Sequence, residues 1–161
     1  MVSEHQACLL LGSNIQPEHN LPLAIEGLQD HLTILQISRV WETPSVGTAG
    51  PNFLNAAVLA RTPLDQITLK LEILTPLEAR LGRVRSADKN APRSIDLDII
   101  LFDGRVLDST LWHFAHRAVP VADVKPDLRS EPGERLKDVA EKFVSEGFIH
   151  LRSDVVLQTS G

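Results

Sequence analysis

Five basic side chains gather in a short stretch of an otherwise acidic chain. They are Arg80, Arg83, Arg85, Lys89 and Arg93. The chain has 16 Lys and Arg residues in all and a formal net charge of -5, so nearly a third of its positive side chains lie in this basic cluster. A helix C-terminus could account for Arg80 and Arg83, but not for the three that follow. Guanidinium groups bind phosphate oxygens through paired hydrogen bonds, so the cluster predicts a polyphosphate site.

Two aspartates follow the basic cluster within a strongly apolar segment. Asp96 and Asp98 alternate with Leu97 and Ile99, a pattern that predicts a strand with both carboxylates on one face. Carboxylates about 7 Å apart along a strand repel each other, and burying them without a cation is costly. Magnesium prefers oxygen ligands and joins carboxylates to substrate phosphates, so a metal site is favoured over two solvent-facing aspartates. Paired carboxylates beside arginines indicate phosphoryl-type transfer.

Two other segments are candidates for a second substrate site. The turn Gly12-Ser13-Asn14 ends an apolar strand, where backbone and small polar groups can approach a ligand, although an ordinary turn has the same composition. Phe53 and Asn55 begin another predicted strand. Phe53 suits either a core position or a stacking surface for a flat heterocycle. Asn55 can offer a paired donor and acceptor to an amide-like ring edge.

Composition limits the kind of protein and its partners. The chain has 161 residues, of which 43% are hydrophobic and 23% charged, and this predicts one globular domain over residues 1–161. Its net acidity argues against a nucleic-acid or anionic-membrane partner. Cys8 is the single cysteine and lies in an apolar run, so we expect a buried core residue in a reducing compartment. No signal peptide is recognisable, which favours the cytoplasm. The sequence specifies no oligomeric state, and a monomer is the simpler expectation.

Strands and helices alternate along the chain. Apolar patterning predicts strands at residues 7–11, 33–41, 53–60, 94–102 and 105–107, and helices at residues 22–31, 63–81 and 136–143. Within the long helix, Pro76 should produce a kink and Gly82 should end it, while Asp103-Gly104 reads as a hairpin turn. The order strand-helix-strand-strand-helix-strand predicts an α+β, ferredoxin-like sandwich. This is a mainly antiparallel sheet with helices packed on its face.

With these residues in place, the chain resembles the 6-hydroxymethyl-7,8-dihydropterin pyrophosphokinase family over about residues 7–128. The matching blocks are Leu11-Gly12-Ser13-Asn14, Glu42-Thr43-Pro44, Phe53-Leu54-Asn55-Ala56-Ala57-Val58, Leu81-Gly82-Arg83-Val84-Arg85 and Pro92-Arg93-Ser94-Ile95-Asp96-Leu97-Asp98-Ile99. The last two blocks together are highly specific, whereas Gly-Ser-Asn alone is not. The resemblance implies a ferredoxin-like fold and an enzyme of folate biosynthesis. That enzyme transfers the terminal pyrophosphoryl unit of ATP to the hydroxymethyl group of the reduced pterin and releases AMP.

The resemblance also implies roles for individual residues. Two magnesium ions would be held by Asp96 and Asp98, and phosphate charge would be neutralised by Arg83, Arg85 and Arg93. Further contacts with ATP are implied for Glu78, Ile99, Thr110, His113 and Arg117. Contacts with the pterin are implied for Gly12, Thr43, Pro44, Val46, Phe53 and Asn55. Of these, Phe53 would stack on one face of the pterin and Asn55, Thr43 and Val46 would read its edge.

The chain departs from the family pattern after His113. The segment from Phe114 to Val121 is several residues shorter than in the family, and no aromatic residue follows Arg117 to form the second face of the pterin sandwich. Phe114 could take that place from another direction. The aromatic residue usual in the middle of the catalytic loop is also absent, with Asn90 in its neighbourhood.

These departures leave two alternatives to the pyrophosphokinase. One is an enzyme with the same ATP and magnesium site but a weakened or altered pterin acceptor site. The other is a non-catalytic nucleotide-binding or regulatory domain. An RNA-binding sheet would need exposed aromatics and a basic surface, and this chain has 4% aromatic residues, no Tyr and a net negative charge.

Overall fold

A computed structural model describes residues 4–45, 50–83 and 93–160 of the chain. Its strands are β1 (His5–Ser13), β2 (Thr33–Ile37), β3 (Trp41–Thr43), β4 (Phe53–Thr62), β5 (Asp96–Phe102), β6 (Arg105–Val106) and β7 (His150–Leu151). Its α-helices are α1 (Pro17–Gln29), α2 (Gln66–Thr68), α3 (Thr75–Arg80), α4 (Ala115–Val124) and α5 (Leu136–Ser145). A π-helix η1 (Leu69–Leu74) joins α2 to α3, and a 3-10 helix η2 (Ser109–Trp112) precedes α4.

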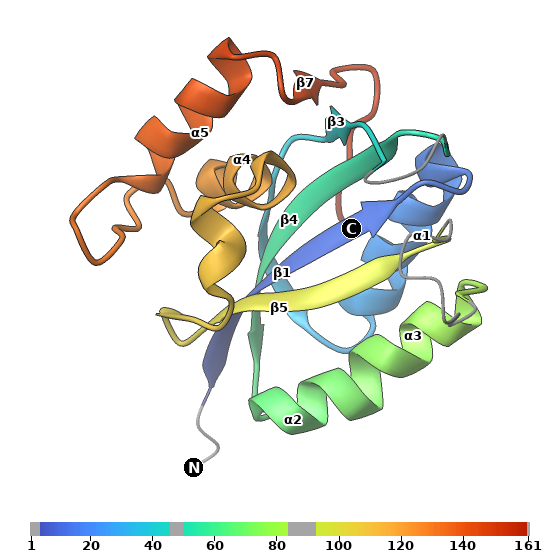
Figure 1. Ribbon diagram of the computed structural model, residues 1–161. Helices are drawn as coiled ribbons and strands as arrows, with labels where there is room; N and C mark the ends of the chain where they lie inside the picture. Colours follow the sequence, from blue (N-terminus) through green and yellow to red (C-terminus); the bar gives the residue numbers. More distant parts are fainter. Residues whose placement is uncertain (1–3, 46–49, 84–92, 161) are drawn as a thin grey trace.

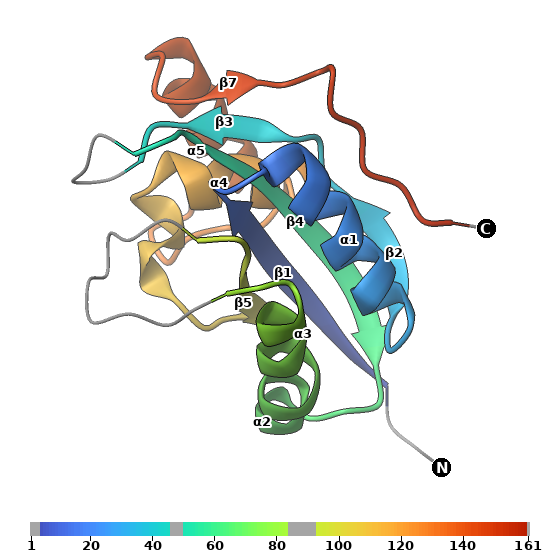
Figure 2. The ribbon, with the colours of Figure 1, turned by 90° about the vertical axis from the view of Figure 1, so that its right-hand side faces the viewer.

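The strands form a single antiparallel sheet in the order β6-β5-β1-β4-β3-β7, with β2 also pairing with β4. Helices cover both of its faces (Figures 1 and 2). On one side α1 and the α2–η1–α3 helix pack over the core that contains Leu9 and Leu11. On the other side α4 and α5 cover Cys8 and Leu10. The uninterrupted apolar run of β1 therefore follows from burial of alternate side chains on opposite faces.

The predicted ferredoxin-like α+β fold is confirmed, and a second helical layer is added to it. Pattern reasoning missed α4 because Pro120 lies inside it. Proline has no N–H to donate within a helix, and it usually interrupts one. Here most of the helix is buried against the sheet, and this packing outweighs the lost hydrogen bond. None of the helices in the described ranges is long and apolar enough to span a membrane.

The predicted long helix is continuous but irregular. It begins at Asp65, whose carboxylate accepts a hydrogen bond from the N–H of Thr68 at 2.8 Å, and not at residue 63 as predicted. Its middle is the π-helix η1, and Pro76 follows at the start of α3. A wider helical turn before a proline suits a residue that cannot make the regular backbone bond. Gly82, with φ of 89°, ends the helix as predicted.

Two other sequence predictions have clear outcomes. Asp103 and Gly104 both have positive φ, 51° and 80°, as a tight hairpin turn requires. Cys8 is buried, as expected, and its burial raises the pKa of the thiol to about 12. The single strand predicted over residues 33–41 is wrong, because the chain forms β2 and β3 with a break at Ser38. There the Ser38 hydroxyl accepts a hydrogen bond from the N–H of Ala57 at 2.7 Å.

Gly27 marks the closest approach of α1 to α3. A Cβ added there would come within 3.0 Å of one terminal methyl carbon of the buried Leu77 and closer to the other. Alanine is a better helix former than glycine by about 1 kcal/mol, but overpacking a core costs about 1–3 kcal/mol. We expect Gly27→Ala to lower the free energy of unfolding by up to about 2 kcal/mol net, measured by urea denaturation. Glu26→Ala, at an exposed position on the same helix, is the control and should leave stability unchanged or raised. Equal stability of the two variants would contradict this packing.

Candidate active site

Strand register brings three of the predicted blocks together at one end of the sheet. Gly12 on β1 lies opposite Asn55 on β4 and opposite Asp96 on β5. On the far side of β4, Thr43 pairs with Phe53. A Cβ at Gly12 would stand 3.6 Å from the side-chain oxygen of Asn55 and 3.8 Å from the ring of Phe53. Glycine therefore leaves open a space between the acidic strand and the polar and aromatic side chains of β4.

The two carboxylates on β5 have different surroundings. Asp96 accepts a hydrogen bond from Arg93 at 2.8 Å and lies 3.5 Å from the guanidinium of Arg83. The carboxylate of Asp98 has neither a hydrogen bond nor an ion pair with any of the described residues. Burial raises the pKa of the Asp98 carboxyl above its ordinary value, and the negative charge of Asp96 raises it further. The protein thus compensates Asp96 through direct contacts, whereas the charges of Arg117, Lys70 and Arg93 offset that of Asp98 only in part.

This donor set fits a hard divalent cation. A cation beside Asp98 would relieve both the desolvation of the carboxylate and its repulsion from Asp96. In the described part of the chain no group of three or more His, Cys, Asp or Glu side chains is placed to hold a metal ion. Magnesium commonly takes only one or two protein carboxylates and completes its shell with water and phosphate oxygens, so two carboxylates suffice for it.

The two described arginines of the basic cluster that face Asp96 are held by local structure. The N–H of Arg83 donates to the carbonyl of Glu78 at the end of α3, 3.0 Å away. The Arg83 side chain is only 11% exposed, and its Nε and one Nη are buried without a hydrogen-bond partner among the described residues. Buried donors without partners are costly, and a phosphate oxygen would satisfy them. Arg83 is therefore suited to bind an anion.

Gly12 and Ser13 belong to β1 and not to a turn as predicted, and Ser13 and Asn14 fix the segment that carries Arg93. The side-chain oxygen of Asn14 accepts from the N–H of Arg93 at 2.6 Å, and the N–H of Asn14 donates to the Arg93 carbonyl at 3.0 Å. The Ser13 hydroxyl donates to the carbonyl of Ser94. These groups of Ser13 and Asn14 bond to the protein itself and are not exposed contacts for a ligand. They clamp the entry to β5, and this pairing of residues about 80 positions apart left no local sequence signal.

Glu78 ties α3 to the same strand. It is 4% exposed, and one carboxylate oxygen accepts a hydrogen bond from the N–H of Leu97 at 2.8 Å. Leu97 lies between Asp96 and Asp98, so Glu78 helps to fix the strand segment that presents both. The implied contact of Glu78 with ATP stays a prediction.

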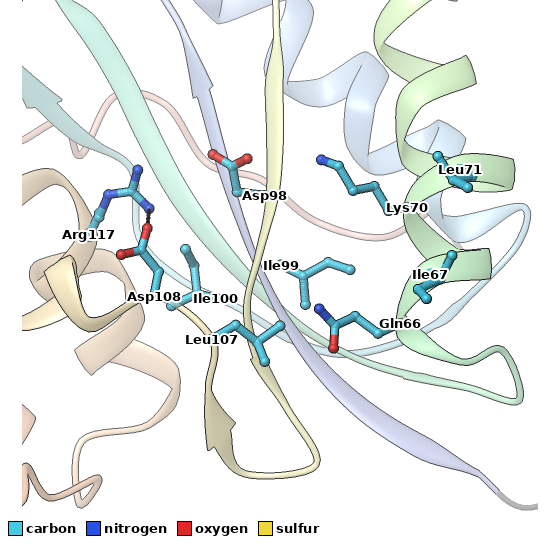
Figure 3. A pocket seen from close by; sticks show the side chains of 10 residues that line it. All are labelled: Gln66, Ile67, Lys70, Leu71, Asp98, Ile99, Ile100, Leu107, Asp108 and Arg117. Atoms are coloured by element: carbon cyan, nitrogen blue, oxygen red, sulfur yellow. Dashed lines mark ion pairs between the residues drawn. The ribbon is translucent and has the colours of Figure 1, made fainter.

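A cavity of about 310 Å³ runs along β5, and Asp98 is one of the residues that line it. Figure 3 shows Lys70 and Gln66 reaching toward β5 from the α2–η1 helix, with Arg117 and Asp108 on the other side of the strand. Arg117 pairs with Asp108 at 3.1 Å. The remaining lining residues are Ile67, Leu71, Asp98, Ile99, Ile100 and Leu107. The cavity combines an apolar wall with cationic groups.

Sequence reasoning missed part of this cavity. Lys70 and Gln66 are spaced four residues apart on one helix face, which reads as an ordinary solvated surface. Asp108 was not singled out either, although its carboxylate accepts hydrogen bonds from both the N–H and the hydroxyl of Thr110, at 2.9 and 2.6 Å. Asp108 thus caps η2 through Thr110, and neither Thr110 nor His113 lines the cavity.

On the opposite side, the predicted pterin residues form a connected group. The amide nitrogen of the buried Asn55 donates to the hydroxyl of Thr43 at 2.9 Å and to the Trp41 carbonyl at 3.1 Å. Phe53 is half-buried and borders the space left by Gly12. We call Gly12, Thr43, Phe53 and Asn55 the acceptor site below. Pro44 follows β3 directly.

The shortened segment after His113 places an aromatic pair at the start of α4. Phe114 is 47% exposed, and its ring stacks on that of His116 with centroids 5.5 Å apart. Burial lowers the pKa of His116 to about 4, and the positive charge of Arg117 contributes. The imidazole is therefore neutral at pH 7. Sequence reasoning named Phe114 but not His116. Four residues of interest, Val46, Arg85, Lys89 and Asn90, lie outside the described residues.

Comparisons with known proteins show the family of the chain. A profile of the 7,8-dihydro-6-hydroxymethylpterin-pyrophosphokinase family matches residues 8–126. The 2-amino-4-hydroxy-6-hydroxymethyldihydropteridine pyrophosphokinase of Pseudomonas aeruginosa is 31% identical over 153 residues, covering 88% of this chain and 93% of the relative. The protein of the same name from Aquifex aeolicus is 36% identical over 126 residues, covering 76% and 78%. The chain belongs to the 7,8-dihydro-6-hydroxymethylpterin-pyrophosphokinase family.

A solved structure supports the fold alone. Wild-type Plasmodium falciparum HPPK-DHPS superposes with a TM-score of 0.71 at 12% sequence identity, covering 89% of this chain and 45% of that one. The chain therefore spans less than half the length of that solved protein.

The Glu78 anchor predicts a loss of stability when its carboxylate is removed. Glu78→Ala leaves the N–H of Leu97 buried without its acceptor, and such a group costs about 1–3 kcal/mol. We expect the free energy of unfolding, from urea denaturation, to fall by about that amount. Glu72→Ala, on an exposed position of the same helix, should change it little. If both variants were equally stable, the hydrogen bond to β5 would have no structural role.

Proposed function

We propose that this chain transfers pyrophosphate from ATP to the hydroxymethyl group of 6-hydroxymethyl-7,8-dihydropterin, giving AMP and the pterin diphosphate, in folate biosynthesis. The observation that carries the proposal is the register that places Gly12 between Asp96 and Asn55. It sets the carboxylate pair and its arginines beside the aromatic ring of Phe53 and the amide of Asn55. The family match supports the same reaction, and it spans both sides of the site.

Asp96 and Asp98 would hold magnesium, and we propose two ions bound together with ATP. Magnesium, when bound, would neutralise phosphate charge and orient the phosphates for transfer. The protein groups around it have separate tasks. Arg93 and Arg83 supply positive charge on the side of Asp96, and the unpaired donors of Arg83 can bind phosphate oxygens. Arg85 is assigned the same task from the family resemblance.

ATP is proposed to occupy the cavity along β5. On its outer edge β5 pairs with β6 only at Leu101 and Phe102 within the described part of the chain, so the strand edge at Ile99 faces the cavity. An adenine ring fits against the apolar wall, where Ile99 and Leu71 lie. Lys70 and Arg117 would then bring positive charge to the nucleotide. Further contacts from Glu78, Thr110 and His113 are carried over from the family resemblance.

The reaction needs no covalent protein intermediate. The pterin hydroxyl oxygen bonds to the β-phosphorus of ATP while the bond from that phosphorus to the bridging oxygen of AMP breaks in line. The hydroxyl proton is released to solvent. Catalysis by this chain is then mostly positioning and charge stabilisation, in which arginine donors in a partly buried site act strongly.

The acceptor site would hold the pterin against Phe53, with Asn55 and Thr43 at the edge of the ring, together with Gly12, Pro44 and Val46. We propose that Phe114, backed by the neutral His116, supplies the second aromatic face. The alternatives of an altered acceptor and of a non-catalytic domain gain no support from the family match. A single domain over residues 1–161, a monomeric state and a cytoplasmic location stay predictions from composition.

Asp98→Asn tests the metal and the reaction together. It removes a ligand charge needed for magnesium, and we expect AMP formation from ATP and the pterin to fall by about 100-fold or more. The thermal midpoint should not fall, because the variant also removes a half-buried charge that desolvation and the neighbouring Asp96 both disfavour. AMP and ADP are separated by chromatography. Asp138→Asn, an exposed position on α5, is the control. Release of ADP by the unaltered protein would overturn pyrophosphoryl transfer.

Phe114→Ala tests the second stacking face. Losing one aromatic contact should weaken pterin binding by roughly 2- to 12-fold, since such contacts are worth about 0.5–1.5 kcal/mol. The KM for ATP should stay within about twofold of its original value. Phe148→Ala removes an aromatic ring that is similarly exposed and also pairs with another ring, and it serves as the matched control. Unchanged pterin affinity in Phe114→Ala would exclude this role.

A further inference from the structure

The segment after residue 126 lies outside the family match, yet it contacts the acceptor side of the sheet. β7 pairs with β3, with Leu151 opposite Trp41 and His150 opposite Glu42. Figure 1 shows β7 beside β3 at the edge of the sheet. The N–H of Arg152 then donates to the carbonyl of Val40 at 2.9 Å. The C-terminal segment is therefore fixed along the strand that ends in Thr43.

Arg152 sits among three carboxylates. Its guanidinium donates to Glu42 at 2.9 Å and makes two bonds to Asp154, at 2.9 and 2.8 Å. Glu18, from the start of α1, lies 3.5 Å away. The hydrogen bonds to Asp154 and Glu42 raise the pKa of Arg152, so it remains charged. A planar guanidinium with several donors can hold these groups in one geometry, which an ammonium cannot.

Glu42 passes this contact on to the acceptor site. Its second carboxylate oxygen accepts a hydrogen bond from the side chain of Asn52 at 2.8 Å. Hydrogen bonds from Asn52 and then Arg152 lower the pKa of Glu42 below its ordinary value, so it is ionised at neutral pH. Glu42 directly precedes Thr43, and Asn52 directly precedes Phe53. The Glu42 carboxylate thus links the two chain segments that lead into Thr43 and Phe53 of the acceptor site.

The neighbouring contacts leave β3 dependent on this link. On one side Asn55 holds β3 through Thr43 and the Trp41 carbonyl. On the other side the Arg152–Glu42–Asn52 link holds it. β3 spans only Trp41–Thr43, so few backbone bonds fix its position. Small displacements of binding groups weaken a site much more than they weaken a fold.

We propose that Arg152 is a positioning residue for the acceptor site, acting through Glu42 and Asn52 to fix where Thr43 and Phe53 lie. The proposal rests on the proposed function, in which Thr43 and Phe53 bind the pterin. Partly exposed ion pairs contribute little to global stability, so the effect should be on pterin binding and not on unfolding.

The test compares Arg152→Met with Arg152→Lys and with Arg61→Met. Arg61 is also an arginine with a carboxylate nearby, Glu4 at 4.0 Å, but it lies at the other end of β4 from Phe53. Steady-state AMP formation gives KM for each substrate, and a thermal melt reports stability. For Arg152→Met we expect the pterin KM to rise about 5- to 20-fold with the ATP KM within about twofold. Arg152→Lys should recover part of the loss, and Arg61→Met should show none.

A double-mutant cycle with Glu42→Gln completes the test. Because Arg152 acts through Glu42, Arg152→Met combined with Glu42→Gln should be no worse than the more affected single variant. Equal changes in both KM values, an unchanged pterin KM in Arg152→Met, or additive effects in the cycle would overturn the proposal. These outcomes differ from failure of the proposed function, in which the unaltered protein would itself form no AMP from ATP and the pterin.

Discussion

Two carboxylates on one face of β5 repel each other, and much of the surrounding structure compensates for that repulsion or maintains it. Asp96 is paired with Arg93 and Arg83, whereas the half-buried Asp98 has no such partner among the described residues. For this imbalance to persist, the strand and the arginines must both be fixed. Glu78 fixes the strand at Leu97, and Asn14 fixes the segment that carries Arg93. The fold thus holds negative charge at a defined place, which a cation can compensate, and the arginines beside it can bind a polyphosphate.

The two sides of the site depend on different parts of the sheet. The proposed nucleotide side is formed by the outer edge of β5 and the irregular α2–η1–α3 helix, while the proposed acceptor side is formed by β3 and β4. Gly12 on β1 lies between Asp96 and Asn55, and its missing side chain leaves space beside Asn55 and Phe53. Because separate elements support each side, a change in the C-terminal segment reaches the acceptor without passing through the carboxylates.

Local sequence signals predicted the candidate site residues but not the contacts that hold them in place. The Asp96-x-Asp98 alternation, the basic cluster and the hairpin turn at Asp103 depend on neighbours within a few residues, so they could be read directly. The clamp from Asn14 to Arg93 and the link from Arg152 to Glu42 join residues about 80 and 110 positions apart. Such contacts leave no periodicity or spacing to read. α4 was missed for a different reason, since burial of its apolar face overrode the unfavourable Pro120.

α4 also explains how a shortened segment can still serve the site. The helix packs over β1, β3 and β4, and Arg117 in its first turn interacts electrostatically with Asp98, so its first residues lie near the carboxylates as well as the acceptor strands. Arg117 is in the first turn and faces the nucleotide cavity, while His116 stacks on Phe114. With a pKa of about 4, His116 adds no positive charge near Asp96 at neutral pH. A charged imidazole there would compete with a metal ion for the carboxylates. Its burial therefore allows an aromatic surface to lie beside a cation site without weakening it.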